Sequence, residues 1–468
     1  MSEPRIGAAA LRALLGEWED GRAVYVALAE RVRLLIADGR VPARTRLPAE
    51  RELAAALGRS RTTVAAAYRA LRESGHLVSV RGSGSAAALP AAEAAASSVV
   101  DFARAMPPAV PGLDAIVRRA LDDLPAALAA PGFDLVGDPG LRARIADRYT
   151  ARGLPTTPEQ IVVTLGAQHA LGLCARTLVR RGDRVLVEIP TYPYGYEAFG
   201  AAGARLVGTP VTRDGWDVGR LRDVLARTAP TAAYLIPDFH NPTGASMPPA
   251  DRDRVHAAAR RAGTTLVVDE TTADLDLGRP PGDGPFATRP GVVTVGSLGK
   301  SVWGGLRIGW IRADPGLLAR VVAARAATDL GTPALEQRIA AAALDELPAL
   351  LAVRTAELRE RRDVLTAALR ARFPDWDVPD ADGGVGLWVG LDAPAGSVLA
   401  AAAQARGLAI NAGARFTIDG SCERFLRVPF TAPVPQITRG VGLLAEAWTA
   451  LRDLTAAPHG SRRAPDVI

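Results

Sequence analysis

The stretch SLGKSVWGGLRIG, residues 297–309, contains Lys300, which is the only lysine among the 56 lysine and arginine residues of the chain. Arginine cannot replace lysine where an amine must form an imine, because a guanidinium stays protonated and is a poor nucleophile. The same stretch contains Arg307, whose planar guanidinium is suited to binding a phosphate. We therefore expect covalent amine chemistry at Lys300; the alternative is that one lysine survived by chance.

Short apolar runs alternate with helical segments on both sides of this stretch. Each run is rich in valine and isoleucine and is bounded by Gly, Pro or Asp. This alternation predicts a mostly parallel sheet covered by helices. From about Leu351 a long Arg/Glu-rich helix leads into a terminal α+β portion. The runs are Ile161–Leu165, Val185–Ile189, Leu206–Val211, Ala232–Ile236, Leu266–Val268, Val292–Val295 and Ile308–Ile311.

Several polar motifs lie at or near the ends of these runs. The motif TLGAQ, residues 164–168, opens a helix, so its backbone amides can bind a phosphate. Asp269 directly follows a run, whereas His169 and His240 adjoin two motifs and are expected to be structural. Each motif alone is more often structural than functional, but their order around the only lysine indicates one common site. The other motifs are PTYP at residues 190–193, NPTG at residues 241–244 and FLRVPF at residues 425–430.

Through these motifs, residues from about 100 to 455 resemble the fold-type-I PLP-dependent aminotransferases. The resemblance implies an α/β transferase domain that binds pyridoxal 5′-phosphate (PLP) as an aldimine on Lys300, the catalytic residue. It implies that Asp269 pairs with the pyridinium nitrogen and that Asn241 binds the pyridine hydroxyl. Tyr192 would stack on the ring, and Arg427 would bind the α-carboxylate of a substrate or effector. The implied phosphate ligands are Gly166, Ala167, Gln168, Ser297 and Arg307.

Two places depart from the pattern of this family. Its members usually have a tyrosine two or three residues after the aspartate, where this chain has Thr271 and Thr272. They often have an aromatic residue before Gly-Asp-Pro that reaches the phosphate of the neighbouring subunit, where this chain has Val136. Both departures argue against efficient transamination, and neither threatens PLP binding. If the domain turns over, the resemblance implies a PLP-dependent aminotransferase.

The N-terminal region carries the basic excess of the chain. Residues 40–85 contain nine arginines and three acids, an excess as large as the net charge of +6 of the whole chain. Such a patch is typical of a nucleic-acid-binding segment, with a solvated basic face as the alternative. Apolar spacing predicts a first helix from Val24, a second before Gly58 and a third over Arg61–Arg72, followed by a short strand at Leu77–Val80. This order is that of a winged helix-turn-helix.

Residues 24–84 resemble the winged helix-turn-helix of the GntR regulators. The matching motifs are LPAERELA at residues 47–54, SRTTV at residues 60–64, GHL at residues 75–77 and RGSG at residues 81–84. A head of this kind joined to an aminotransferase-like domain has the layout of the MocR-type regulators. The implied DNA contacts are Arg51 on the positioning helix, Ser60, Arg61, Thr62 and Thr63 at the start of the recognition helix, and Arg81 and Gly82 on the wing.

Changes in composition predict the domain boundaries. We expect a winged helix-turn-helix domain over residues 1–84, an aminotransferase-like domain over residues 100–456 and a disordered tail over residues 457–468. The Ala/Ser-rich residues 85–99 between the two domains are expected to be a linker, with an Ala-rich helix as the alternative.

No signal-peptide pattern and no apolar stretch near the ~20 residues of a membrane span are present. The two cysteines, Cys174 and Cys422, form no ligand-like spacing, so we expect reduced thiols, no metal site and a cytoplasmic protein without membrane partners.

Three functions fit these patterns. The leading hypothesis is a PLP-dependent transcriptional regulator that binds double-stranded DNA and senses an amino compound, or PLP itself, at Lys300. The second is an active aminotransferase with an accessory DNA-binding domain, and the third is a regulator whose aminotransferase-like domain is only a dimerisation scaffold. The lone lysine argues against the third, and the missing tyrosine argues against the second. A homodimer is expected, because fold-type-I sites resembling this one are built at a two-fold interface.

Overall fold

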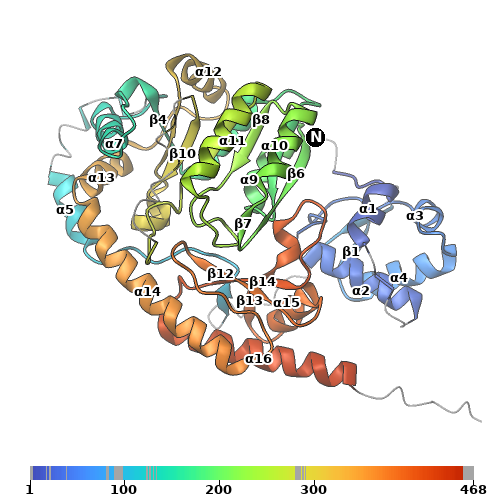
Figure 1. Cartoon of the computed structure of the whole chain (residues 1–468). Helices are drawn as coiled ribbons and strands as arrows, with labels where there is room; N and C mark the ends of the chain where they lie inside the picture. Colours follow the sequence, from blue (N-terminus) through green and yellow to red (C-terminus); the bar gives the residue numbers. More distant parts are fainter. Residues whose placement is uncertain are drawn as a thin grey trace, which may run out of the picture.

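The computed structural model divides the chain into three regions (Figure 1). We call them the head (residues 4–88), the large domain, which is built on an eight-stranded sheet, and the small domain, which is built on a four-stranded sheet near the C-terminus. The structure describes residues 4–16, 18–19, 23–37, 39–80, 84–88, 99–122, 125, 128–129, 131–132, 134–279, 286, 289 and 291–456.

The sheet of the large domain has the strand order β4-β11-β10-β9-β8-β5-β6-β7. The strands from β10 to β6 in this row are parallel. Strand β11 is antiparallel to both of its neighbours, and β7 is antiparallel to β6. The predicted mostly parallel sheet is confirmed, with β11 as a reversed strand inside it. The bounds are β4 Ile161–Thr164, β5 Arg184–Ile189, β6 Arg205–Thr212, β7 Gly215–Trp216, β8 Ala232–Leu235, β9 Thr265–Asp269, β10 Val293–Ser297 and β11 Gly309–Arg312.

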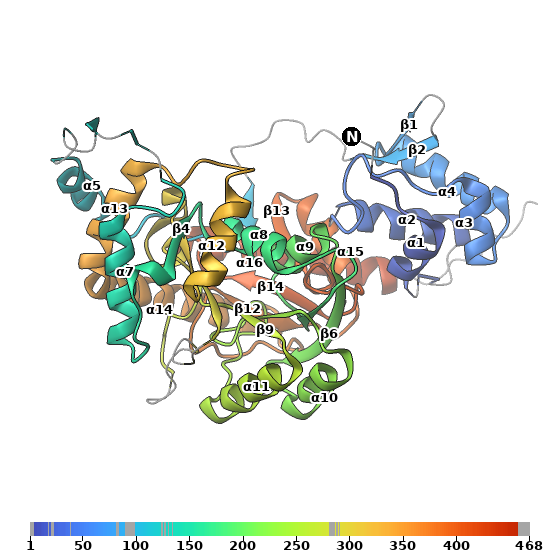
Figure 2. The ribbon, with the colours of Figure 1, turned by 90° about the horizontal axis from the view of Figure 1, so that it is seen from above.

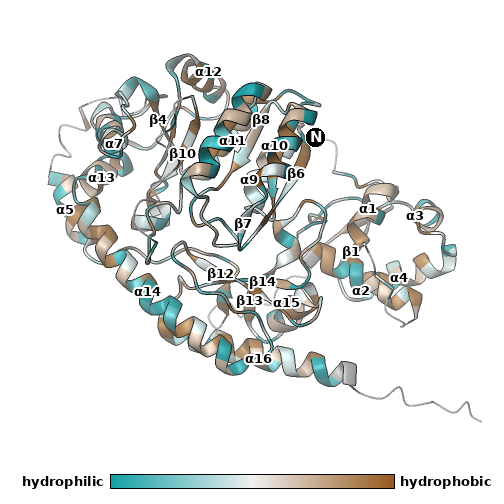
Figure 3. Cartoon of the chain, viewed as in Figure 1, coloured by the Kyte–Doolittle hydropathy of each residue, from teal (hydrophilic) through white to brown (hydrophobic). Residues whose placement is uncertain are grey.

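Helices cover both faces of this sheet (Figure 2). Helices α8, α9 and α12 pack on one face and α10 and α11 on the other, and each face has its own apolar core. Figure 3 shows α11 largely in teal, as expected for a hydrophilic surface helix. The helix bounds are α5 Leu113–Asp122, α7 Pro139–Ala151, α8 Ala167–Leu178, α9 Pro193–Ala201, α10 Val218–Thr228, α11 Pro249–Ala262, α12 Pro315–Arg325 and α13 Ala334–Asp345.

The small domain has a sheet of order β12-β14-β13-β3. Strand β3 is the first element after the predicted linker, and it joins the edge of this sheet parallel to β13. The predicted Arg/Glu-rich helix is α14, and it begins four residues earlier than expected, at Leu347. The bounds are β3 Val100–Phe102, α14 Leu347–Arg372, β12 Gly386–Gly390, α15 Gly396–Gln404, β13 Leu408–Ala412, a 3-10 turn at Gly413–Phe416, β14 Phe425–Pro429 and α16 Val434–Ala456.

The head has the predicted helices and strand hairpin. Ser60 caps α4, because its side chain accepts a hydrogen bond from the Thr63 backbone amide at 3.1 Å. Helix α1 was not predicted, and its Leu11 and Leu15 are fully buried in the core of the head. Strand β2 reaches Ala87, so the expected boundary at residue 84 is too early. The bounds are α1 Ala8–Leu15, α2 Val24–Ala37, α3 Glu50–Leu57, α4 Arg61–Glu73, β1 Leu77–Val80 and β2 Gly84–Ala87.

The head lies beside the small domain in both views, with α2 against α15 (Figures 1 and 2). The predicted wing residues Arg81 and Gly82, residues 89–98 of the predicted linker and the predicted tail from residue 457 lie outside the described residues. In the part of the chain that the structure describes, no helix has both the length and the apolar character needed to cross a bilayer.

Candidate functional site

One cavity of about 370 Å³ brings the predicted cofactor and effector residues together. It lies where strands β5, β8, β9 and β10 end, which is the usual position of a ligand site in an open α/β sheet. Gly166 is the one predicted residue that does not line it directly. The predicted residues that line it are Ala167, Gln168, Tyr192, Asn241, Asp269, Ser297, Lys300, Arg307 and Arg427.

Lys300 lies in a short helical turn that follows β10. Its Nζ donates to the backbone oxygen of Ala105 and lies 2.8 Å from the Met106 sulfur. Burial lowers the pKa of Lys300 to about 7, helped by the charges of Arg427 and Arg307 and opposed by Asp269. A large fraction of this amine is therefore uncharged near neutral pH, which is the nucleophilic form.

The residues suited to a phosphate surround the N-terminus of α8. Gly166 has a φ of +82°, and a Cβ there would lie only 2.8 Å from Nη2 of Arg307. Arg307 donates to the backbone oxygen of Leu165 at 2.9 Å, which holds its guanidinium against this turn. Ser297 Oγ accepts from the Gly299 amide at 3.0 Å. Helix amides, a hydroxyl and a guanidinium thus face one corner of the cavity, and these groups fit a phosphate.

Asp269 lies at the end of β9 with both carboxylate oxygens hydrogen-bonded. Oδ2 accepts from the Tyr234 hydroxyl at 2.9 Å, and Oδ1 accepts from the Thr271 amide at 2.9 Å and from the Thr271 hydroxyl. Burial raises the pKa of Asp269, and the hydrogen bonds from Thr271 and Tyr234 oppose this effect. The carboxylate is fixed in orientation and keeps acceptor capacity toward the cavity.

The two threonines in place of the family tyrosine line the cavity but are bonded locally. The Thr271 hydroxyl is engaged by Asp269, and the Thr272 hydroxyl donates to the backbone oxygen of Asp238 at 3.0 Å. A threonine hydroxyl in these bonds orients the aspartate and the preceding loop instead of extending into the cavity.

The histidines expected to be structural brace two loops of the site. His169 Nδ1 accepts from the Leu165 amide at 3.1 Å, and its Nε2 lies 3.1 Å from Asp329, so it holds the turn before α8. His240 is fully buried, with Nε2 3.2 Å from Glu188 and Nδ1 2.9 Å from the Thr243 hydroxyl. His240 therefore holds the loop that presents Asn241.

Arg427 lies on β14, and its cross-strand neighbour on β13 is Asn411. Both side chains donate to the backbone oxygen of Ala103. Within the described residues the buried Nε of Arg427 has no hydrogen-bond partner. Burial lowers the pKa of Arg427 to about 10, with Asp101 acting in the opposite direction. The Arg427 guanidinium thus has unused donor capacity that a carboxylate ligand could accept, so Arg427 fits the predicted carboxylate contact.

Sequence reasoning missed three polar residues of the site. Tyr234 lies inside an apolar run, which predicts a core residue, although a buried tyrosine normally needs a partner for its hydroxyl. Asn411 is the only polar side chain of β13, which was a usable signal. Arg415 follows β13 and pairs with Glu197 at 2.6 Å, a partner that local patterns do not reveal.

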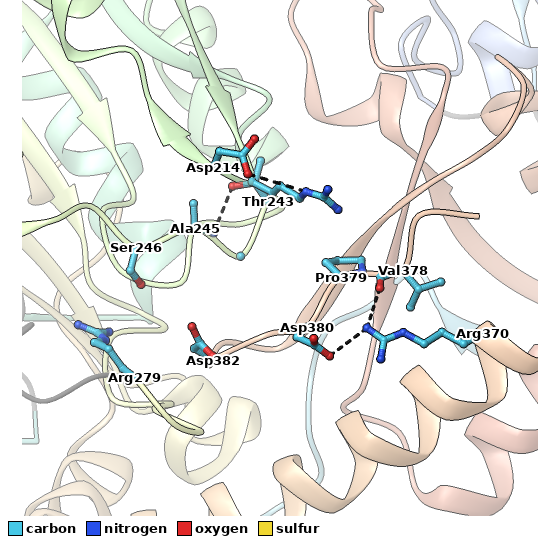
Figure 4. A pocket seen from close by; sticks show the side chains of 12 residues that line it. Asp214, Thr243, Ala245, Ser246, Arg279, Arg370, Val378, Pro379, Asp380 and Asp382 are labelled. Carbon is cyan, nitrogen blue, oxygen red and sulfur yellow. Dashed lines mark hydrogen bonds and ion pairs between the residues drawn. The ribbon is translucent and has the colours of Figure 1, made fainter. Parts of the chain in front are cut away.

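A second cavity, of about 600 Å³, lies between the large and small domains (Figure 4). None of the predicted site residues lines it. Two of its arginines have acidic partners nearby: Arg370 donates to Asp380 at 3.0 Å and Arg213 donates to Asp377 at 2.6 Å. The charges of these two arginines are therefore compensated by carboxylates of the chain.

In the head, the contact of Arg61 with Glu50 at 3.8 Å brings the N-termini of α3 and α4 together. The Arg61 side chain is 73% exposed, and Arg51, Ser60 and Thr62 are also exposed, whereas Thr63 is half-buried. The start of α4 thus presents a guanidinium and hydroxyls to solvent, which are groups suited to DNA.

The two parts of the chain match two known families. Residues 113–442 match the family described as "Aminotransferase class I and II", and residues 24–86 match "Bacterial regulatory proteins, gntR family". The fold and the site define a PLP-binding domain of aminotransferase fold type I joined to a winged helix-turn-helix. The chain belongs to the class I and II aminotransferase family, and its two-domain layout is that of the MocR-type regulators.

Relatives include both regulators and enzymes. The "Probable rhizopine catabolism regulatory protein MocR" of Rhizobium meliloti is 29% identical over an alignment that covers 92% of this chain and 97% of that protein. The "2-aminoadipate transaminase" of Thermus thermophilus is 30% identical over 313 residues, 65% of this chain and 79% of that enzyme. The crystal structure of LysN, an α-aminoadipate aminotransferase from Thermus thermophilus complexed with N-(5′-phosphopyridoxyl)-L-leucine, aligns with a TM-score of 0.70 at 27% identity over 77% of this chain and 94% of that chain.

The Lys300 amine is expected to titrate near pH 7, because burial and the charge of Arg427 disfavour its protonated form. Trace acetylation of the cofactor-free protein measures this directly, because the chain has no other lysine. Mass spectrometry of the peptide that contains Lys300 should show a labelling rate that rises up to about pH 7 and then levels off. A rate that keeps rising to about pH 10, where an ordinary lysine titrates, contradicts the prediction.

Proposed function

We propose that this chain is a PLP-dependent transcriptional regulator, in which the head binds double-stranded DNA and the aminotransferase-like domain binds PLP and senses an amino compound or PLP itself. The observation that carries the proposal is the convergence of Lys300, Asp269, Arg307 and Arg427 in one cavity of a chain whose head is a winged helix-turn-helix. When bound, PLP supplies an aldehyde that forms an imine with an amine and a ring that withdraws electrons.

Each group of residues has one task toward the cofactor and the effector. The turn at Gly166–Gln168, Ser297 and Arg307 would hold the phosphate, and Tyr192, Asn241 and Asp269 would hold the ring. Lys300 presents an amine that is partly uncharged at neutral pH. Arg427 binds the carboxylate of the effector, and the buried Nε without a partner supports this role.

The DNA contacts come from the head. Ser60, Arg61, Thr62 and Thr63 at the start of α4 read or bind the major groove, supported by their exposure and by the cap of α4. Arg51 contacts the backbone or a base from α3, and Arg81 and Gly82 contact it from the wing. We also propose a homodimer assembled through the aminotransferase-like domain, because fold-type-I sites resembling this one are built at a two-fold interface and DNA half-sites come in pairs.

The second candidate function is an active aminotransferase with an accessory head. Enzyme relatives and the lowered pKa of Lys300 favour it. The local bonding of Thr271 and Thr272 in place of a tyrosine disfavours it. The absorption spectrum during addition of amino acids separates the two: a stable shift without keto-acid product indicates a sensor, and conversion with product indicates an enzyme.

Lys300→Ala is expected to abolish covalently held PLP, because the chain has no second lysine. The measurement is the mass of the protein after borohydride reduction and denaturation. Lys300→Arg is the matched variant, since it keeps the charge and removes the reactive amine. A borohydride-fixed adduct in either variant would refute the assignment.

Arg61→Ala is expected to weaken DNA binding by about 1–3 kcal/mol and to relax the sequence preference at one position, because a bidentate base contact is lost. Fluorescence anisotropy with operator variants measures both effects, and PLP binding should be unchanged. Arg261→Ala, on the exposed surface of α11, is the control for loss of a positive charge. Equal affinity and equal preference for wild type and Arg61→Ala would show that Arg61 reads no base.

The PLP-loaded protein is expected to sediment as a dimer at low micromolar concentration without DNA. Residues of fold-type-I sites come from both subunits, so assembly and cofactor occupancy should depend on each other. A monomer with full PLP occupancy would rule out a shared site.

A further inference from the structure

One segment of the small domain contacts the effector cavity, the head and the wall of the cavity in the large domain. We call residues 413–427 the connecting segment; it begins with the turn Gly413–Phe416 and ends in β14. Its last residue, Arg427, lies in the effector cavity. Its middle residues contact the head, and its first residues contact the wall of the cavity.

The contact with the head is a buried cluster of charges around Glu423. The Glu423 carboxylate accepts from Arg31 Nη1 at 2.9 Å and lies 3.5 Å from Arg40 Nη2. It also accepts from the Ser397 amide and hydroxyl, both at 2.9 Å. A Cβ on Gly420 would lie 2.7 Å from Arg40 Nη1, so the connecting segment fits closely against the head.

The cluster is largely shielded from water. The side chains of Arg40, Arg31 and Glu423 are 4%, 15% and 19% exposed. Burial acts to raise the pKa of Glu423, but the hydrogen bonds and charges of Arg31, Ser397 and Arg40 bring it below its usual value. The carboxylate therefore stays ionised, and the strength of this contact depends closely on its geometry.

The start of the connecting segment is fixed to the large domain. Arg415 pairs with Glu197 at 2.6 Å and donates to the Tyr196 hydroxyl at 3.1 Å. Both partners lie on α9, which begins directly after Tyr192 at the wall of the cavity. The contacts of Arg415 therefore resist a shift at the first end of the connecting segment. A shift that begins at Arg427, the last end, is passed on toward Glu423.

Glu423 and Arg427 are joined by Arg424 and the first two residues of β14, Phe425 and Leu426. Strand β14 pairs with β12 along its whole length and with β13 at Leu426 and Arg427, so its backbone is extended and a displacement at Arg427 reaches Glu423 over a short, stiff path.

We propose that the connecting segment couples the effector cavity to the head: a carboxylate bound at Arg427 shifts β14 and so changes the docking of Arg31 and Arg40 on Glu423. This inference rests on the proposed function, because it assumes that a carboxylate-bearing ligand binds at Arg427.

The test uses the full-length, cofactor-free protein and two ligands that differ in one group. N-(5′-phosphopyridoxyl)-L-alanine carries a phosphate, a ring and an α-carboxylate, whereas N-(5′-phosphopyridoxyl)ethylamine has the same skeleton and lacks only the carboxylate. Hydrogen exchange followed by mass spectrometry reports the docking of the head through the amides of α2, Val24–Ala37. With both ligands at saturation, α2 exchange is expected to differ about fivefold or more between them.

The variants locate the coupling at Glu423. In Glu423→Gln, α2 is expected to exchange faster and to respond equally to the two ligands. Arg31→Gln removes the nearer of the two arginine partners of Glu423 and should also remove the difference between the two ligands, and the double variant should add little to either. Glu346→Gln, which removes an exposed partner of Arg119 far from the head, is the control and should behave as wild type.

Ligand binding, followed by absorbance, shows that each variant is folded. Equal α2 exchange with the two bound ligands in wild type overturns the inference, and so does a full response in Glu423→Gln. If Glu423→Gln does not fold, Arg31→Gln decides alone, because Glu423 keeps its bonds to Ser397 there. If neither ligand binds wild type, the proposed function itself fails and the inference fails with it.

Discussion

The register of the parallel strands is the constraint on which the site depends. Asp269 lies opposite Val295 of β10, and Tyr234 lies opposite Val267 of β9, so the aspartate and its tyrosine partner reach the same edge of the sheet. Side chains alternate between the faces of a strand, so a slip of one residue would turn Asp269 away from the cavity. The apolar residues of β8, β9 and β10 are almost fully buried, and their burial fixes the register of these strands.

Two fully buried arginines, Arg325 and Arg354, make structural contacts that a lysine could not make. Arg325 is fully buried and donates to the backbone oxygens of Leu135 and Val163 and to the Thr332 hydroxyl. Arg354 is also fully buried and donates to the backbone of Ser301 and Val302, directly after Lys300. A lysine has three donors on a point charge and cannot make such forked contacts. The single lysine thus stands at the position where a reactive amine is useful, on a turn that arginine helps to hold.

Local patterns predicted the strands of the large sheet except β7 and three of the four helices of the head, whereas the roles of the cavity residues came from the resemblance to known families. Apolar runs bounded by Gly, Pro or Asp report burial directly, and the motifs around Lys300 lie at the ends of those runs. The partners that orient these residues were missed, because they come from distant parts of the chain. Tyr234 is 35 residues from Asp269, and Glu423 is 392 residues from Arg31. The residues next to Glu423 in sequence give no sign of the arginines that folding brings to it.

Breaking the ion pair at Glu423 would cost more free energy than a ligand usually contributes to coupling, so we expect a bound ligand to weaken or strengthen this contact without breaking it. Removing one partner of a buried ion pair costs about 3–5 kcal/mol, whereas coupling between two sites is usually about 1–3 kcal/mol. A ligand therefore needs to change only part of the docking energy. The two arginines are held unequally, at 2.9 Å for Arg31 and 3.5 Å for Arg40, so a small shift of Glu423 changes their balance without releasing both. Glu423 directly precedes the last four residues of the connecting segment, so a shift of β14 at Arg427 changes the distances from the Glu423 carboxylate to both arginines.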